Sequence, residues 1–529
     1  MSKNQDYAAE QSQIEGEEEQ LDEEGGNRFL LFQVMPSWMT SFIVHVVLII
    51  VLALLTFKLP VKETVSLEAG EPSQQTEQLD EMSAEPVEFT DPFENTEMED
   101  TMETEVMEEF TEVAVAEFSE DSVEFDTTLF ENVAGIESSA MSAVGATAGM
   151  TGGRSASNKA AMLKKWGGTA GSENAVKLAL EWIAKHQLEN GSWSFDHRTG
   201  PNSRERLSPN PGRYSSSEYG ATSLALLPFL GAGQTHTEGE YKETVKAGVE
   251  FLLDRGRETG YSYREGQGNM YSHALATLLL TELYSMTRDS ALADPAQQAL
   301  NFIVRAQEPT GGGWRYRVQE VGDTSVTGWM VMALKSGHMA GLNVPEETVR
   351  GASRFLDSVS AESNVHYGYL QPITPGRRRP ALTAVGLLCR MYLGWDKDHP
   401  SLRTGTEYLG RLRPHIGDWA LGDKPSENEK TDFNCDMYFN YYATQVMRHN
   451  GGEMWTKWNE EMREFLIASQ AQRAQPKGSW YFSYPSDLGT QVGGRLYCTA
   501  MATMTLEVYY RYMPLYDTQK TEESEFKFE

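Results

Sequence analysis

The segment Ala299-Leu-Asn-Phe-Ile-Val-Arg-Ala-Gln-Glu-Pro-Thr-Gly-Gly-Gly-Trp314 carries the pattern that decides the fold. It begins with apolar side chains at helical spacing and continues through Gln307 and a glycine turn to a tryptophan. Two further segments, 179–193 and 462–480, repeat the order of helix, glutamine, glycine turn and tryptophan. A pattern that returns along a chain predicts a repeat architecture.

Three weaker copies, which begin near Ala247, Ala352 and Glu407, keep the helix and an aromatic residue after the turn. Each of the six copies is followed by a second segment rich in small residues; these segments are 219–226, 271–277, 324–334, 381–388, 438–445 and 499–506. Small side chains let neighbouring helices approach closely, so we expect the second helices to form an inner ring inside the bulkier first helices. The prediction is an all-α fold of six helical hairpins closed into a double ring.

The three strong copies resemble the repeat shared by squalene and terpenoid cyclases and by protein prenyltransferase β subunits, which is the α/α toroid. The resemblance covers residues 171–516. It implies that the repeated glutamines and tryptophans are structural ties rather than catalytic groups; they are Gln187, Trp193, Gln307, Trp314, Gln470 and Trp480. Because this fold also serves binding and thioester domains, it does not by itself define the activity.

The resemblance also indicates where a catalytic group would lie. Cyclases of the squalene-hopene type need an Asp-x-Asp-Asp cluster, because one carboxylic acid must stay protonated. The matching position here holds Asp323 alone, followed by Thr324 and Ser325. Asp323 is therefore either a catalytic acid or the N-cap of its helix.

A zinc site of the prenyltransferase kind is a weaker alternative. Asp432, Cys435 and Asp436 supply acidic and cysteine ligands, with Cys498 and His449 further along, but their spacing differs from the Asp-x-Cys of that family. Buried, unreactive cysteines explain the same residues. We therefore expect no metal and no other cofactor.

The starts of the inner helices supply aromatic and charged candidates for a ligand cavity: Tyr219, Tyr271, His273, Trp329, Tyr438, Tyr441, Arg495 and Tyr497. Aromatic rings at these positions suit an isoprenoid or other apolar ligand, and they equally suit plain packing. The three arginines 377–379 form either a phosphate clamp or a solvated loop.

The N-terminal part of the chain has a different character. Residues 1–27 are polar and acidic, which predicts disorder. Residues 38–58 are apolar over a length that spans a hydrocarbon core of roughly 30 Å as a helix. Ser41 and His45 share one face of this helix and resemble the anchor of TonB-type energy transducers. That resemblance implies a membrane-protein partner and a periplasmic toroid.

Residues 59–160 are interpreted as a disordered acidic linker that ends in a hinge of Gly, Ala and Ser, and residues 517–529 as a tail. From residue 63 to residue 153 there are 25 acidic side chains and no Lys or Arg, and the whole chain has a net charge of -32. Nucleic acid is not an expected partner, because phosphate contacts need a basic surface.

Together these features predict a single-pass protein of a bacterial cytoplasmic membrane. Its toroid is expected to act as a binding or scaffold module. The alternative is an enzyme similar to terpenoid cyclases or prenyltransferases that acts on an isoprenoid.

Overall fold

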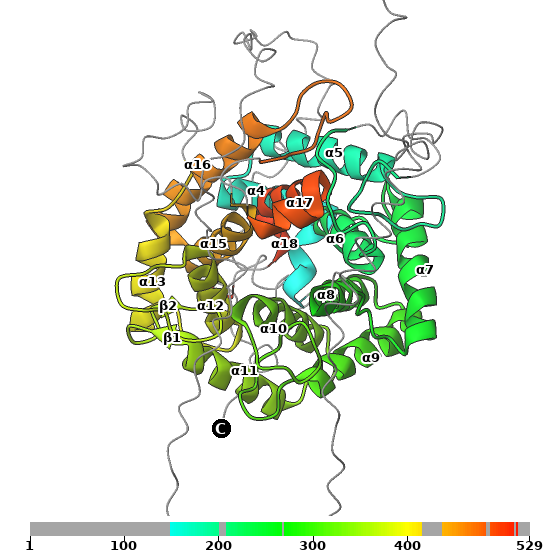
Figure 1. Ribbon diagram of the computed structural model, residues 1–529. Coiled ribbons are helices and arrows are strands. Elements are labelled where there is room, and N and C mark those ends of the chain that lie inside the picture. The colour runs from blue at the N-terminus through cyan, green and yellow to red at the C-terminus, as the bar shows by residue number, and fades with distance from the viewer. Residues whose placement is uncertain are drawn as a thin grey trace, which may run out of the picture. The chain divides into compact units, whose positions relative to one another are not determined.

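The computed structural model describes residues 149–199, 208–266, 269–414, 436–482, 487–512 and 515–516. Figure 1 shows that the helices of this part lie in two concentric rings. The inner ring consists of α6 (Glu218–Gly231), α8 (Asn269–Thr287), α10 (Thr324–Met339), α12 (Pro380–Tyr392), α15 (Met437–Asn450) and α17 (Leu488–Leu506). The outer ring consists of α5 (Ala170–Lys185), α7 (Lys242–Thr259), α9 (Ser290–Ala306), α11 (Glu346–Val359), α13 (Pro400–Gly410) and α16 (Gly452–Ser469). The described residues thus form the double ring of six hairpins that the repeat predicts.

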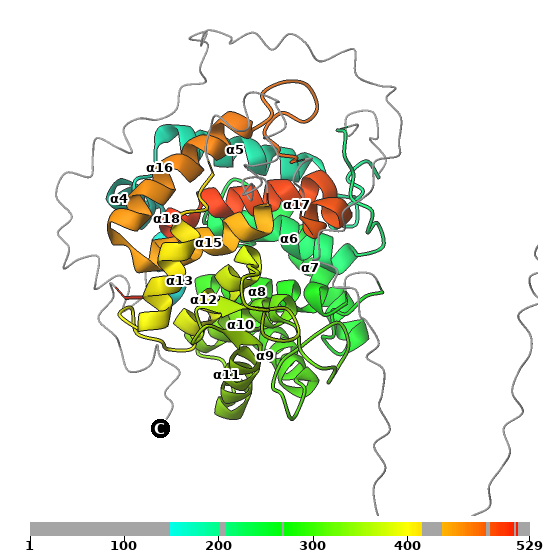
Figure 2. The ribbon, with the colours of Figure 1, turned by 60° about the vertical axis from the view of Figure 1, so that its left-hand side comes forward.

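The rings close on themselves. Each inner helix packs against the next, and α17 packs against α6. In the outer ring α16 lies beside α5, as Figures 1 and 2 both show. Glycine permits close approach between inner helices, since a Cβ added to Gly328 of α10 would lie 2.4 Å from Cγ1 of Val385 in α12. The small residues of the second helices therefore set the spacing of the inner ring.

The repeated glutamines join one outer helix to the next. Each donates two hydrogen bonds from its amide nitrogen, one to a carbonyl in its own glycine turn and one to a carbonyl in the first turns of the following outer helix. Gln470 donates to Gly478 at 2.9 Å and to Ala175 of α5 at 2.8 Å, which ties the last outer helix to the first. Gln187 and Gln307 make the corresponding pairs of bonds.

The repeated tryptophans hydrogen-bond the turn to both the outer and the inner helix of a repeat. Trp480 is buried and donates its indole N–H to the carbonyl of Leu466 in α16 at 2.8 Å. Its backbone N–H donates to the hydroxyl of Thr499 in α17 at 3.1 Å. Trp193 and Trp314 make the same two kinds of bond. A strong repeat is thus fastened to its outer helix, its turn and its inner helix.

A short segment before the first hairpin also belongs to the folded unit. We call it the strap; it consists of the 3-10 helix η1 (Gly149–Arg154) and helix α4 (Ala156–Trp166), drawn in cyan in Figure 1. It packs against α8 and against α18 (Val508–Arg511). The prediction of a linker up to residue 160 is therefore wrong from residue 149 onward. The reason is tertiary: Arg154, Met162 and Leu163 are buried against distant parts of the chain.

A two-stranded antiparallel pair, β1 (Ser360–Ala361) and β2 (His366–Tyr367), lies between α11 and α12. These strands were not predicted from the sequence.

In the described part of the chain, no helix is long and apolar enough to span a membrane. The predicted membrane helix, with Ser41 and His45, lies outside the described residues, as do the acidic tail and residues 517–529.

Candidate functional site

The inner helices begin at one end of the ring, which we call the mouth. The hydroxyl of Tyr271, at the start of α8, lies 2.6 Å from the hydroxyl of Ser325, at the start of α10. Tyr438, at the start of α15, donates its hydroxyl to the carbonyl of Ser325 at 3.3 Å. The backbone N–H of Tyr438 donates to Asp487, which precedes α17, at 2.9 Å. The mouth is therefore the place where side chains of different repeats meet.

Acidic side chains cap four of the inner helices at the mouth. Glu265 accepts hydrogen bonds from the N–H groups of Tyr219 at 3.0 Å and Gly220 at 2.8 Å, in the first turn of α6. The N-caps of α10, α15 and α17 are Asp323, Asp436 and Asp487. The first N–H groups of a helix have no partner within the helix, so a carboxylate there stabilises it. Each of these acids has a structural task.

Asp323 is fully buried and uses one carboxylate oxygen as a cap. Its Oδ1 accepts from the N–H of Val326 at 2.8 Å and from the hydroxyl of Ser325 at 2.7 Å. The Nε of Arg315 lies 3.9 Å from Oδ2. Burial raises the pKa of Asp323 to about 6, although the hydrogen bonds and Arg315 act in the opposite direction. The sequence left two roles open for Asp323, a catalytic acid and a helix N-cap. The hydrogen bonds show that it is the N-cap of α10.

A pair of carboxyl groups also lies at the mouth. Asp436 accepts from the N–H of Phe439 at 2.8 Å, and Asp487 accepts from the adjacent N–H of Tyr438. Tyr497 also donates its hydroxyl to Asp487, at 3.1 Å. Burial, followed by the charge of Asp487, raises the pKa of Asp436, and burial also raises the pKa of Asp487. A pair of carboxyls that shares a proton has the chemistry of a general acid and a general base.

Sequence reasoning only partly found this pair. It named Asp436 as a candidate zinc ligand and did not name Asp487. The available signal was the position of Asp487 directly before α17, which is typical of an N-cap. Nothing in the spacing indicates that two aspartates from different repeats cap neighbouring N–H groups of the same helix.

The aromatic candidates at the centre of the ring pack against each other. The ring of Trp329 stacks on that of Tyr441 with centroids 5.7 Å apart, and it meets Tyr442 edge-on at 5.6 Å. The rings of Tyr438 and Tyr442 are 4.9 Å apart. Burial raises the pKa of the Tyr438 and Tyr441 hydroxyls, to about 12 for Tyr441, so both are neutral phenols. These rings pack against one another, and both interpretations of these residues, packing and an apolar ligand site, allow such contacts.

Two candidates point between the inner and outer rings. His273 bonds through Nε2 to the carbonyl of Ala299 in α9 at 3.1 Å, and its Nδ1 accepts from the backbone N–H of Tyr263 at 3.2 Å. Burial lowers the pKa of His273 to about 3. The ring of Tyr219 lies 6.3 Å from that of Phe251 in α7 and 6.0 Å from that of Tyr263. Neither side chain joins the carboxyl pair.

The arginine candidates have structural or surface partners. Arg495 donates from Nε to the carbonyl of Pro209 at 2.9 Å and from Nη1 to the hydroxyl of Ser479 at 3.1 Å. In the loop 377–379, Arg378 is exposed and forms an ion pair with Glu362 at 3.0 Å. This loop has the exposure of a solvated segment.

The structure does not assemble a zinc site from the residues it describes. Cys498 is buried with its sulfur 3.3 Å from the hydroxyl of Thr490, and burial raises the pKa of its thiol to about 12. His449 lies in the last turn of α15, away from the mouth. Asp432 and Cys435 are outside the described residues. Within the described ranges no three His, Cys, Asp or Glu side chains come close enough to hold a metal ion.

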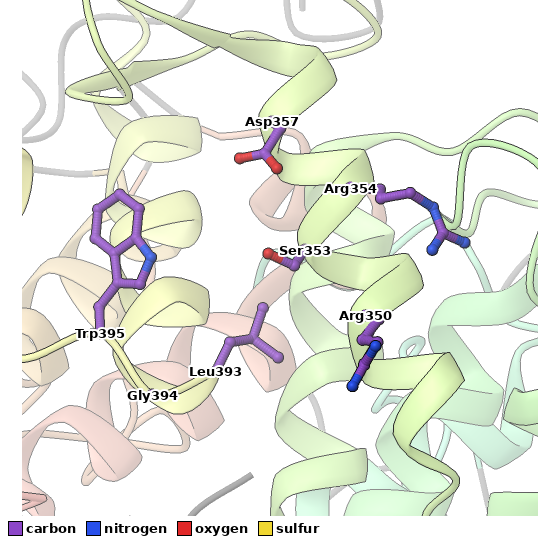
Figure 3. A pocket seen from close by; sticks show the side chains of 7 residues that line it. All are labelled: Arg350, Ser353, Arg354, Asp357, Leu393, Gly394 and Trp395. Carbon is purple, nitrogen blue, oxygen red and sulfur yellow. The ribbon is translucent and has the colours of Figure 1, made fainter. Parts of the chain in front are cut away.

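A separate cavity of about 310 Å³ opens on the outer surface beside α11 (Figure 3). Beneath it, the buried guanidinium of Arg390 pairs with Asp357 and lies 4.9 Å from the ring of Trp395. The lining residues are Arg350, Ser353, Arg354, Asp357, Leu393, Gly394 and Trp395. None of the residues singled out from the sequence lines this cavity.

Comparisons with known proteins give a likeness of fold. No family model and no curated protein matches the sequence. Among solved structures, the α-1,6-mannanase GH76A of Salegentibacter sp. HEL1_6 is 12% identical and covers 63% of this chain and 99% of its own, with a TM-score of 0.41. The type II terpene cyclase MstE from Scytonema is 14% identical and covers 64% of this chain and 97% of its own, also with a TM-score of 0.41. Both structures are α/α toroids, and at TM-scores of 0.41 the likeness carries no argument about this chain.

Proposed function

We propose that this chain is a membrane-anchored α/α toroid that binds an apolar ligand, of isoprenoid type, at the mouth of the ring without transforming it. The observation that carries the proposal is the use of the mouth acids as helix caps. Asp323, which occupies the position of a cyclase acid, gives one carboxylate oxygen to Val326 and Ser325. The surrounding phenols are neutral and offer an apolar face with a polar tip.

The ligand can be sought directly. The full chain, purified in mild detergent, is extracted and the extract is analysed by mass spectrometry for small apolar molecules. We expect an isoprenoid at a fixed ratio to protein, and we expect it to decrease in Tyr438→Leu. Tyr284→Leu, near the other end of α8, is the matched control and should retain the molecule. Equal recovery from both variants, or none from the unmodified chain, argues against binding at the mouth.

The absence of catalysis is a separate expectation. Protonation of an alkene requires a supported strong acid, and loss of one catalytic group from a cooperating set costs roughly two or more orders of magnitude in rate. We expect the purified chain to convert neither squalene nor prenyl diphosphates, with or without added zinc. A cyclised product that disappears in Asp323→Asn would show instead that the cap is also a catalytic acid.

A second candidate function, acid catalysis on an isoprenoid, draws support from the Asp436 and Asp487 pair. Its proton donor would be Asp436, whose pKa is raised to about 8. Turnover that is lost in Asp436→Asn and retained in Asp323→Asn would establish this function in place of simple binding. Both variants keep a side chain that caps a helix well.

The anchor and the orientation are also part of the proposal. Support comes from the apolar residues 38–58 and from the shared helix face of Ser41 and His45. A cysteine placed at Ser73 should react with a membrane-impermeant maleimide in intact spheroplasts, because the toroid is proposed to be periplasmic. Protection at Ser73 together with labelling at a cysteine placed at Ser12 would reverse the orientation.

A further inference from the structure

The outer cavity beside α11 has a charged wall and an aromatic wall. The aromatic wall is the turn that follows α12 and carries Trp395. The charged wall is one face of α11, because its lining residues are spaced three or four positions apart; they are Arg350, Ser353, Arg354 and Asp357. Figure 3 shows both arginines on the side of the cavity remote from Trp395. Two such walls suit a ligand that joins a carboxylate to an aromatic group.

The aromatic wall is held in place from beneath. Arg390 is 2% exposed, and it donates from Nε to the hydroxyl of Tyr367 at 3.2 Å and from Nη1 to the hydroxyl of Ser353 at 3.0 Å. Its guanidinium carbon lies 4.9 Å from the ring centre of Trp395. The ring of His399 stacks on the same indole with centroids 3.7 Å apart. The half-buried indole is thus already ordered, so a ligand that packs against it pays little to immobilise it.

The charged wall leaves a place for a carboxylate. Asp357 is the acidic residue of the lining, and its ion pair with Arg390 cancels its charge. Arg350 and Arg354 each pair with a glutamate in the first turn of α11, and the side chains of these pairs are between 44% and 74% exposed. Exposed ion pairs contribute little to stability, so a second carboxylate can share or replace a glutamate at these arginines.

The last residues that the structure describes lie beside this cavity. Tyr516 donates its hydroxyl to the carbonyl of Trp395 at 2.8 Å. The backbone N–H of Leu515 donates to Nδ1 of His449 at 3.4 Å. The chain that follows Tyr516 therefore starts from a point fixed to the aromatic wall.

The segment 517–529 has the composition that the two walls require. It contains five acidic and two basic side chains, and it includes Glu525, Phe526 and Phe528. An extended chain spans about 3.3–3.6 Å per residue, so the residues from 517 to 526 cover up to roughly 35 Å. Adjacent side chains of an extended segment point to opposite sides. Glu525 can therefore meet the arginines while Phe526 meets the indole.

We propose that the outer cavity is a docking site for an acidic and aromatic peptide segment, and that its occupant is the chain's own segment 517–529. The carboxylate of Glu525 binds Arg350 and Arg354, and the ring of Phe526 packs against Trp395. This site is separate from the mouth and does not depend on the ligand proposed there.

Photocrosslinking of the full chain in mild detergent tests the docking. Benzoylphenylalanine in place of Phe526 should crosslink to the residues that line the cavity, as mapped by proteolysis and mass spectrometry. Arg350→Ala combined with Arg354→Ala should lower this crosslink at least about fivefold, because the carboxylate loses both partners. Arg255→Ala combined with Arg257→Ala is the matched control, since it removes two exposed, paired arginines of α7, and it should leave the crosslink unchanged.

Three outcomes of the crosslinking would overturn the proposal. The first is a set of crosslinks from position 526 that map away from the cavity. The second is an equal decrease of the cavity crosslink in the two double variants. The acidic region before the ring also contains Glu-Phe pairs, such as Glu117-Phe118. The third is a cavity crosslink from benzoylphenylalanine at position 118 with none from position 526, which would make that region the occupant.

A peptide gives an independent measurement of the same site. A fluorescent, amidated peptide of residues 517–529 should bind a chain that ends at Tyr516. It should bind the full chain at least about tenfold more weakly, because the tethered segment competes at high effective concentration. Phe526→Ala in the peptide should weaken binding to the shortened chain. Equal affinity for the two chains, or no binding to the shortened chain, would contradict the proposal.

Discussion

A buried aspartate at the start of a helix is subject to two opposed effects. The N–H groups of the first turn lower its pKa because they favour the charged form, and burial raises it because charge is poorly solvated there. At Asp323 and Asp436 burial prevails, and their pKa values rise to about 6 and about 8. The caps at the mouth therefore carry less negative charge at neutral pH than their number suggests.

The role of Asp323 as a cap can be tested with two substitutions. Asp323→Ala removes the acceptor for Val326 and Ser325, and we expect it to lower the free energy of unfolding by about 1 kcal/mol. Asp323→Asn retains an acceptor and should change it by much less. Urea unfolding of the full chain in detergent measures both. If Asp323→Asn lowered the free energy of unfolding more than Asp323→Ala, the cap would not be the contribution that Asp323 makes to stability.

The raised pKa of Asp436 makes a prediction about pH. Because the folded form holds the proton more tightly than the unfolded chain, this group stabilises the fold fully below about pH 4, and the contribution is lost as the pH rises towards 8. Asp436→Asn cannot ionise, so its stability should fall less between pH 4 and pH 8. Burial also raises the pKa of Glu507 to about 8, so part of the fall in stability with rising pH should remain in Asp436→Asn. Thermal unfolding at several pH values measures this dependence. If the pKa of Asp436 were not raised, stability would change with pH equally in Asp436→Asn and in the unmodified chain.

At the scale of the helices, the strong repeats owe their regularity to one glutamine and one tryptophan each. Gln470 has the added task of joining α16 to α5. Gln470→Leu leaves the carbonyls of Ala175 and Gly478 without this donor, and we expect a loss of about 1–3 kcal/mol in the free energy of unfolding. Gln298→Leu, which loses a surface bond to Asp294, is the control and should be near neutral. If Gln470→Leu and Gln298→Leu lowered the free energy of unfolding by similar amounts, the bonds of Gln470 would not contribute more than an ordinary surface bond.

These elements also show what can be predicted from the sequence. The hairpins are local: Trp480 reaches Leu466 only 14 positions away, and such spacing is visible in the chain. The strap could not be predicted because its burial depends on Glu282, 128 positions from Arg154, while its own composition is typical of a hinge. The pairing of Asp436 with Asp487 is non-local in the same way. Sequence periodicity reports which residues form helices, and not which helix ends come together.

For the whole molecule, the position of the strap changes where the folded unit begins. A chain starting at residue 171 lacks Arg154, Met162 and Leu163, whereas one starting at residue 147 retains them. We expect the shorter chain to fold into a helical ring but to lose at least about 3 kcal/mol, from the burial of two apolar side chains. Circular dichroism and urea unfolding compare the two. A shorter chain that does not fold would contradict an autonomous ring.

The bonds that close the ring link its first and last segments. Arg154 donates to the carbonyl of Arg511, 357 positions later, and Gln470 donates to Ala175, 295 positions earlier. Neither bond can form until almost the whole chain is present in one compartment, so the early hairpins are left with an uncovered apolar edge until then. Contacts this distant in sequence form slowly, and waiting apolar surfaces are prone to aggregate. We therefore expect the interval before ring closure to be the stage of folding at which this protein is most prone to aggregate.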